Sequence, residues 1–265
     1  MMPPVLHDAL PFAPWTDPVA WRLPGVGPVE IGDWLLRDEV FAQQMALRDR
    51  LIADQSQAVH ACLPQALGAA RECLGLVLSV LAHDDGYSVG KSTVIRPDGV
   101  KVALDRDQPL LTLGRLVQED ICLMEAGPDG HVLTGAILCF PASWTLSEKI
   151  GRPLSTIHRP VPEYAGVAPR VQRLFDAIRP GHILGRANAV RHHDPSLFHP
   201  RSETDPPDIR HGAPGGPFVR SERQTLRRLP DSGAVVFAIH TYVVPIERLT
   251  NDQRSAMESA ALKSG

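Results

Sequence analysis

The stretch FVRSERQTLRRLPDSGAVVFAIHTYVV, residues 218–244, decides the fold. Its second part, residues 234–244, is rich in Val, Ile and Phe, which is typical of a buried strand. Its first part, residues 218–229, is a strand pattern with charged side chains on both faces. Asp231, Ser232 and Gly233 between them are turn residues, so the stretch predicts an antiparallel hairpin.

The rest of the chain adds strands and helices around this hairpin. A second hairpin is expected at residues 121–125 and 132–140, and a single strand at 182–191. Apolar periodicity and capping residues predict helices at the following positions: 33–63, 67–81, 110–119, 147–149, 170–178, and 250–263 with a T-x-x-Q capping box. The result is an α+β fold with a PAS-like antiparallel sheet of about five strands, a helical N-terminal region and a C-terminal helix.

The domain organisation follows from proline content. Residues 1–32 are proline-rich, which argues against a regular helix, and carry Trp15 and Trp21. We therefore expect an extended arm lying on the body of the protein. Residues 33–265 form a single expected domain whose first part, 33–82, is helical.

Composition excludes several functional classes. The net charge of -3 gives no basic excess for nucleic acid, and the longest apolar stretch, 74–82, is shorter than the ~20 residues that cross a membrane. The start of the chain lacks a secretory pattern, and the four cysteines form no CxxC pair, so we expect free thiols and a cytoplasmic location. No GxSxG, GxxxxGK[ST] or GxGxxG motif occurs at a strand-to-helix turn, which argues against a self-sufficient NAD or ATP enzyme.

The charged strand at 218–229 is the first candidate for chemistry. Its middle, around Glu222 and Arg223, leaves neither face apolar. Two interpretations stay open: a polar wall of a pocket, where charges must be paired, or an edge strand with a solvated face. Arg186 and Asn188 share one face of the preceding strand, and these could converge on one pocket with His240 and Tyr242.

Histidines are the second candidates. His240 on a buried strand is more often a hydrogen-bonded sheet histidine than a ligand. The loop histidines have no recognised metal spacing, so we expect no zinc site there: His192, His193, His199 and His211. His158 lies in IHRPVP, residues 157–162, where two prolines stiffen the backbone. A rigid loop of this kind can hold a histidine as an axial ligand. From the pattern alone, a surface histidine is the commoner case.

Five blocks in the same order carry a resemblance. They are LVQED at 116–120, CFP at 139–141 with Trp144 and Glu148-Lys149, IHRPVP at 157–162, RAN at 186–188, and ERQTL at 222–226 with RLP at 228–230. Over about residues 34–262 the chain resembles the haem-dependent oxidative N-demethylase alpha-subunit family, whose best-known activity is oxidative demethylation of dimethylamine with release of formaldehyde.

The resemblance implies a PAS-like pocket for b-type haem, with FMN and 2Fe-2S carried by partner reductase subunits. It places the haem-iron axial ligand at His158, in the matching block. We expect oxidative N-demethylation of a small secondary or tertiary amine with O2, in an enzyme that could be a homo-oligomer. The alternatives are a PAS-like haem sensor without turnover and a scaffold that has lost haem.

Expected roles follow from strand position. Glu222 is the candidate partner of the substrate ammonium and Arg223 a second catalytic candidate. The expected cofactor-binding residues are His158, Arg186, Asn188 and Arg220. One departure from the family is Ala189, where an aromatic residue is usual; if Ala189 lines the cavity, bulkier amines should fit.

Overall fold

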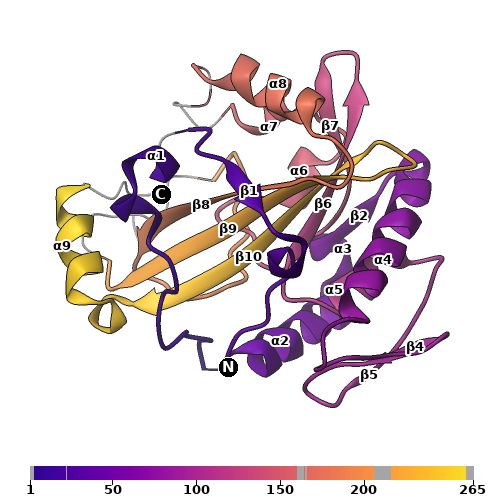
Figure 1. Ribbon diagram of the computed structural model, residues 1–265, viewed down its shortest axis with the longest axis horizontal. Helices are drawn as coiled ribbons and strands as arrows, with labels where there is room; N and C mark the ends of the chain where they lie inside the picture. Colours follow the sequence, from indigo (N-terminus) through magenta and orange to yellow (C-terminus); the bar gives the residue numbers. More distant parts are fainter. Residues whose placement is uncertain (1–2, 22, 160–163, 165, 206–215, 261–265) are drawn as a thin grey trace.

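The computed structural model describes residues 3–21, 23–159, 164, 166–205 and 216–260. Its centre is a seven-stranded antiparallel sheet in the order β1-β8-β9-β10-β6-β7-β2 (Figure 1). The strands are β1 Gly27–Val29, β2 His60–Cys62, β6 Asp120–Gly127, β7 Gly130–Ile137, β8 Ile183–His192, β9 Phe218–Arg228 and β10 Val235–Pro245.

The mixed fold and the antiparallel sheet confirm the prediction, but the number of about five strands is wrong. The five expected strands are all present as β6 to β10, and β1 and β2 extend the sheet at its two edges. Each of these has three residues, too few to show an alternating pattern. A second sheet of three short strands was missed for the same reason: β3 Ser88–Val89, β4 Thr93–Ile95 and β5 Lys101–Ala103. Likeness to a PAS domain stays a prediction.

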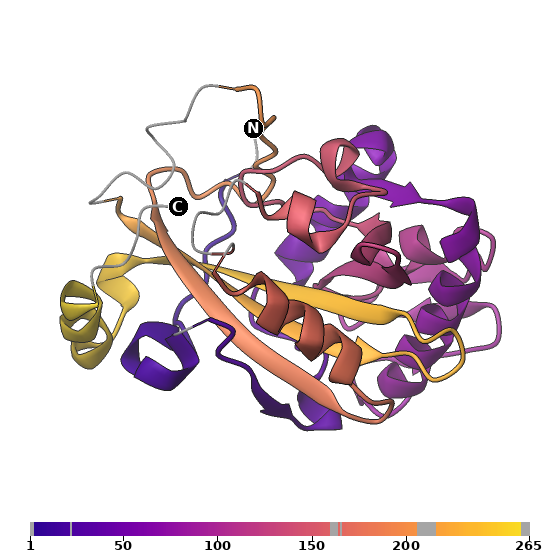
Figure 2. The ribbon, with the colours of Figure 1, turned by 90° about the horizontal axis from the view of Figure 1, so that it is seen from above.

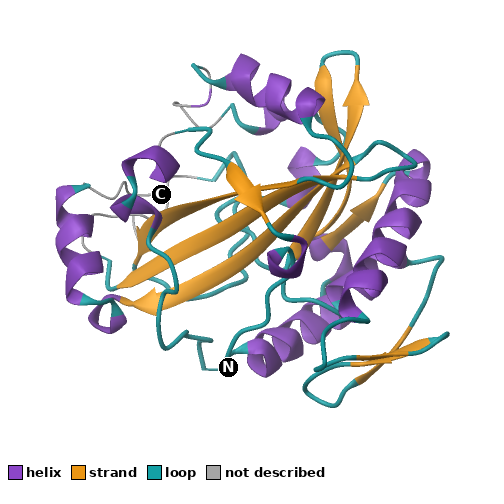
Figure 3. Ribbon diagram, viewed as in Figure 1, coloured by secondary structure: helices purple, strands orange, loops and turns teal. Residues whose placement is uncertain are grey.

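Helices flank the sheet (Figure 3). They are α1 Pro18–Trp21, α2 Phe41–Asp54, α3 Ser56–Val59, α4 Leu67–Leu81, α5 Pro109–Gly114, α6 Leu146–Lys149, α7 Leu154–Ile157, α8 Ala168–Ala177 and α9 Asn251–Ser259. The predicted capping box at Thr250 and Gln253 is confirmed at the start of α9.

The single long helix predicted at 33–63 is wrong. Residues 34–40 are irregular because their backbone amides donate to distant side chains, Leu36 to Glu119 and Asp38 to Gln118. The helix therefore begins only at Phe41. At its other end α2 stops at Asp54, and the short helix α3 leads into β2, which pairs with β7.

The proline-rich arm packs along the sheet. The His7 amide donates to the Val243 carbonyl at 2.9 Å, and the buried Trp15 indole donates to the Gln253 carbonyl at 2.9 Å. Pro18 opens the short helix α1, so the expectation of no regular helix fails over these four residues. The division of the chain into an arm and one domain stays a prediction.

The sheet has two covered faces, named here for one residue on each. The Glu222 face packs against α6, α7 and α8 through an apolar cluster that includes Leu154, Phe175 and Leu226 (Figure 2). The His240 face packs against α4 and α5 at one end (Figure 1). At the other end, the arm and α9 cover it through a cluster that includes Trp15 and Met257. Among the described residues, no helix combines the length and the apolar character that crossing a bilayer requires.

Candidate functional site

Polar side chains from two neighbouring strands meet on the Glu222 face. The register sets Asn188 of β8 opposite Glu222 of β9, and Arg186 opposite Gln224. The Asn188 and Gln224 amides both donate to Glu222 Oε2, at 3.2 and 3.0 Å, and Arg186 Nη1 donates to Gln224 Oε1 at 2.7 Å. β9 lies between β8 and β10, so the edge-strand interpretation is wrong and these charged groups lie inside the sheet.

Arg186, Asn188, Glu222 and Gln224 form a polar row, and this row contains a hydrogen-bond donor that has no acceptor among the described residues. Burial lowers the pKa of the Arg186 guanidinium, while the charge of Glu222 acts in the opposite direction. Arg186 Nε is buried and has no hydrogen-bond partner among the described residues. A buried guanidinium with a free donor is suited to an anionic or carbonyl-bearing ligand.

Arg220 is expected to bind the cofactor, but in this structure its guanidinium binds two backbone carbonyls. Its Nη1 donates to the Leu197 carbonyl at 3.1 Å and its Nη2 to the Phe140 carbonyl at 2.6 Å. Its Nε lies 3.7 Å from Glu222 Oε1, and burial lowers the pKa of the guanidinium. Arg220 thus holds two loop segments against β9 and orients Glu222.

His158 lies at the end of α7 with a defined tautomer. Its Nδ1 lies 3.0 Å from the Leu154 carbonyl, which can only accept, so Nδ1 carries the proton and Nε2 keeps its lone pair. The ring stacks on Tyr164, with centroids 4.3 Å apart and planes inclined by 14°. Burial lowers the pKa of His158, and the charges of Lys149 and Arg186 lower it further, so the imidazole is neutral near pH 7. The prolines expected to stiffen this loop, Pro160 and Pro162, lie outside the described residues.

Lys149 supports this end of α7 and was not predicted as a site residue. It is buried, donates from Nζ to the Ile157 carbonyl at 3.0 Å, and pairs with Glu203. Its proximity to His158 follows from its effect on the pKa of that imidazole. The sequence gives little indication that Lys149 is buried, because a lysine in a short helical turn is normally exposed.

Arg223, His240 and Tyr242 lie on the other face. His240 is paired with Arg223 in the register, whereas Asn188 is paired with Glu222, and neighbouring residues of a strand point to opposite faces. The Arg223 guanidinium donates to the Asp33 and Trp34 carbonyls. The expected convergence of Arg186 and Asn188 with His240 and Tyr242 is therefore wrong.

Ala189 also lies on the His240 face. It is 3% exposed and belongs to the apolar cluster of Leu10, Trp15 and Tyr242. An aromatic side chain at this position would therefore pack against the arm and not near Glu222.

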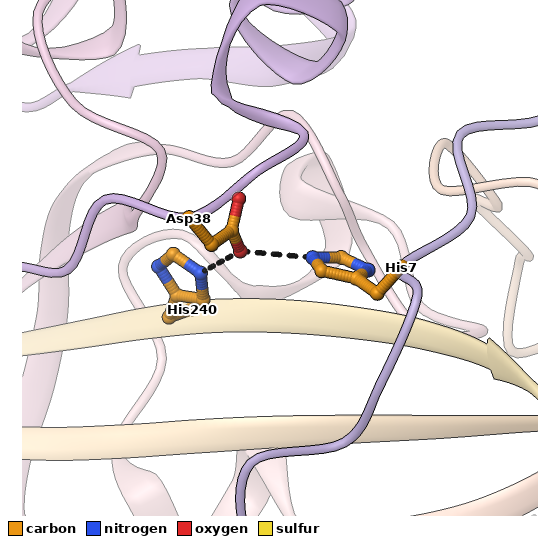
Figure 4. Close-up of side chains that lie close together, drawn as sticks. All are labelled: His7, Asp38 and His240. Carbon is orange, nitrogen blue, oxygen red and sulfur yellow. Dashed lines mark hydrogen bonds and ion pairs between the residues drawn. The ribbon is translucent and has the colours of Figure 1, made fainter. Parts of the chain in front are cut away.

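A second polar cluster lies on the His240 face (Figure 4). Nε2 of His7 and Nε2 of His240 each lie 2.9 Å from Asp38 Oδ2, and His240 Nδ1 lies 3.0 Å from Glu119 Oε1. Burial alone would lower the pKa of His240, but the hydrogen bonds with Asp38 and Glu119 raise it to about 9. Burial alone would raise the pKa of Asp38, and the bonds from His240 and His7 hold it well below its usual range. Sequence spacing gave no signal for this group, because its members come from the arm, a loop and the last strand.

A family model described as haem-dependent oxidative N-demethylase, alpha subunit-like, matches residues 25–264. The matched part contains the whole polar row of the Glu222 face, His158 and Lys149. His7 lies before it.

Proposed function

The chain belongs to the haem-dependent oxidative N-demethylase, alpha subunit-like family, and from this premise we propose that it binds b-type haem through His158 and oxidatively demethylates a small secondary or tertiary amine. The observation that carries the proposal is the His158 imidazole. Its Nδ1 is occupied by the Leu154 carbonyl, which leaves Nε2 as the ligand atom. Histidines that bind metals commonly donate their second nitrogen to a carbonyl in this way.

Other groups of the Glu222 face fit a bound haem. Arg186 offers the buried Nε donor to a propionate, and its charge acts on the pKa of His158, so the two residues share one electrostatic environment. Lys149 holds the Ile157 carbonyl and so fixes the residue before the ligand. When bound, haem supplies the oxidation of an N-methyl group by O2 with two electrons. We further propose that these electrons come from partner reductase subunits with FMN and 2Fe-2S.

Glu222 is the proposed contact of the substrate. Small amines are cations near neutral pH, and the Glu222 carboxylate is 12% exposed within a row of amide donors. Asn188 and Gln224 donate to its Oε2, whereas Oε1 has only the longer 3.7 Å contact with Arg220 Nε and is the oxygen proposed to face an ammonium. The carboxylate thus binds and orients the amine, and the two amides keep the carboxylate in place.

Haem content tests the ligand assignment. We expect His158→Ala to remove most of the Soret absorbance per chain, because it removes the only protein atom proposed to bind the iron. The matched control is His182→Ala, an exposed histidine in the turn before β8, which should keep full haem content. Unchanged haem in His158→Ala contradicts the assignment, and wild-type protein that takes up no haem contradicts the proposed function. Formaldehyde released from dimethylamine, with O2 and a chemical reductant, separates an enzyme from a haem-binding sensor.

A further inference from the structure

His7, Asp38 and His240 bring three ligand atoms together away from the Glu222 face. Both Nε2 atoms lie 2.9 Å from Asp38 Oδ2, and the three atoms all lie within 4.8 Å of one another (Figure 4). Around a tetrahedral zinc ion, ligand atoms are separated by roughly 3.3 Å, given bonds of about 2.0–2.1 Å. The two carboxylate contacts are already close to this spacing, and only the imidazoles need to approach one another.

The outer nitrogens of both histidines have partners suited to metal ligands. His240 Nδ1 lies 3.0 Å from Glu119 Oε1. His7 Nδ1 lies between two groups of Val243, 3.2 Å from the amide that donates to it and 3.4 Å from the carbonyl. A proton on His240 Nδ1 is donated to Glu119 and leaves the lone pair of Nε2 for the centre. His7 Nδ1 accepts from the Val243 amide in this structure, so an ion bound at its Nε2 requires the proton of this ring to move to Nδ1, where the Val243 carbonyl can accept it. A carboxylate behind a metal-bound histidine is a common arrangement, because it fixes the ring and raises its basicity.

The charges of the cluster also favour a divalent cation. Asp38 and Glu119 contribute two negative charges, while His7 and His240 are fully buried. Arg48 forms its ion pair with Asp120, although its charge also interacts with that of Glu119, and Arg223 donates to the Asp33 and Trp34 carbonyls. Glu119 Oε2 is buried and finds no hydrogen-bond partner in the described part of the chain.

We propose that His7, Asp38 and His240 bind one divalent transition-metal ion, of which Zn²⁺ is the model. Two imidazoles and one carboxylate suit zinc and its neighbours, while Ca²⁺ and Mg²⁺ prefer oxygen ligands. The site is independent of haem and of the Glu222 face. Its ligands come from the arm, from the segment before α2 and from β10, so the ion fastens the arm to the sheet. His7 precedes residues 25–264, which the family model matches, so the match includes Asp38 and His240 but not His7.

Zinc titration of the full-length protein tests the proposal. After treatment with EDTA, calorimetry with Zn²⁺ alone should give about one tight site per chain, and thermal melting should shift upward on zinc addition. His7→Gln should lose this site, and Glu119→Gln should weaken it by about 10–100-fold, as expected for the partner behind a metal ligand. His83→Gln, which changes an exposed histidine, should bind as the wild type does.

Two further readouts keep the test decisive. Co²⁺ in place of Zn²⁺ should give the visible absorption of a tetrahedral site in the wild type and not in His7→Gln, while far-ultraviolet circular dichroism reports whether that variant is folded. The Soret spectrum should not change on zinc addition, because haem lies on the other face. Wild-type protein that binds no zinc, or zinc binding that His7→Gln retains, overturns the proposal and leaves the cluster as a hydrogen-bonded contact.

Discussion

Two adjacent residues of β9 lie on the two faces that hold the different polar clusters of this protein. Glu222 points to the face with His158, and Arg223 points to the face with His240. From the sequence, Glu222 and Arg223 are placed in one candidate site, because a strand with charged residues on both faces does not show which face lines that site. What the alternation did predict was that Arg186 and Asn188 share a face, and the structure adds Glu222 and Gln224 to it. The partners on the His240 face come from residues 7, 38 and 119, and no spacing rule links them.

The charge of Glu222 should set the affinity for amines. Glu222→Gln keeps the side-chain shape but removes the ionic part of the contact, so we expect amine affinity to fall by about 10–100-fold, which corresponds to the ~1.5–3 kcal/mol of a charged hydrogen bond. Amine-induced shifts of the haem spectrum measure this. Glu247→Gln, in the short turn after β10, is the control. Equal affinities in the wild type and Glu222→Gln would exclude Glu222 as the ammonium partner.

An aromatic side chain at position 189 should destabilise the protein, because residue 189 is packed against the arm. Ala189→Trp forces an indole into the cluster with Leu10 and Trp15, and overpacking of this kind typically costs about 1–3 kcal/mol. Thermal melting should show a lower midpoint, while amine-induced spectral shifts stay as in the wild type because Ala189 lies on the other face from Glu222. An unchanged midpoint together with altered amine shifts would show that Ala189 lines the substrate cavity after all.

Among the elements, long amphipathic or alternating segments were predictable and short ones were not. The strands β8, β9 and β10, the helix α4 and the capped helix α9 all have enough residues to display their period. β1, β2 and the small second sheet are too short for this. The residues before α2 were misassigned because Gln118 and Glu119 take their amide hydrogens, a competition between distant residues that local sequence does not reveal.

The short helix α7 depends on Lys149 more than on its own sequence. Four residues hold no stable helix alone, and the buried Nζ of Lys149 binds the Ile157 carbonyl next to His158. We expect Lys149→Met to weaken haem binding by about tenfold or more and to shift the Soret maximum, as loss of a positioning partner does. Lys91→Met changes an exposed lysine and serves as the control. A variant with normal haem affinity and an unshifted band would limit Lys149 to a packing role.

At the scale of the whole molecule, one buried ion pair joins the helical layer to the sheet. Arg48 of α2 contacts Asp120 at 2.7 Å, and both side chains are inaccessible to solvent. Arg48 also donates to the Gly114, Gln118 and Glu119 carbonyls, while Asp120 accepts from the Cys139 and Phe140 amides. Helix α2, the segment after α5 and the start of the segment after β7 therefore share one network.

Loss of Arg48 should destabilise the whole fold. Arg48→Met leaves the buried Asp120 without its cation, which typically costs about 3–5 kcal/mol. The exposed pair of Arg71 and Asp107 supplies the matched control, because Arg71→Met should cost no more than about 1 kcal/mol. Urea denaturation of both variants measures the difference. Similar losses of stability in the two variants would contradict the importance assigned to burial.

The packing of the arm on β10 and α9 has a consequence for biosynthesis. His7 and Trp15 are synthesised well before their partners, because Val243 lies 236 residues after His7 and Gln253 lies 238 residues after Trp15. The arm therefore has no native docking surface until β10 and α9 have been made, and its apolar residues Leu10 and Trp15 remain available to chaperones and proteases until then. The synthesis of β10 and α9, and not the folding of the residues before them, therefore sets the moment at which the arm can dock.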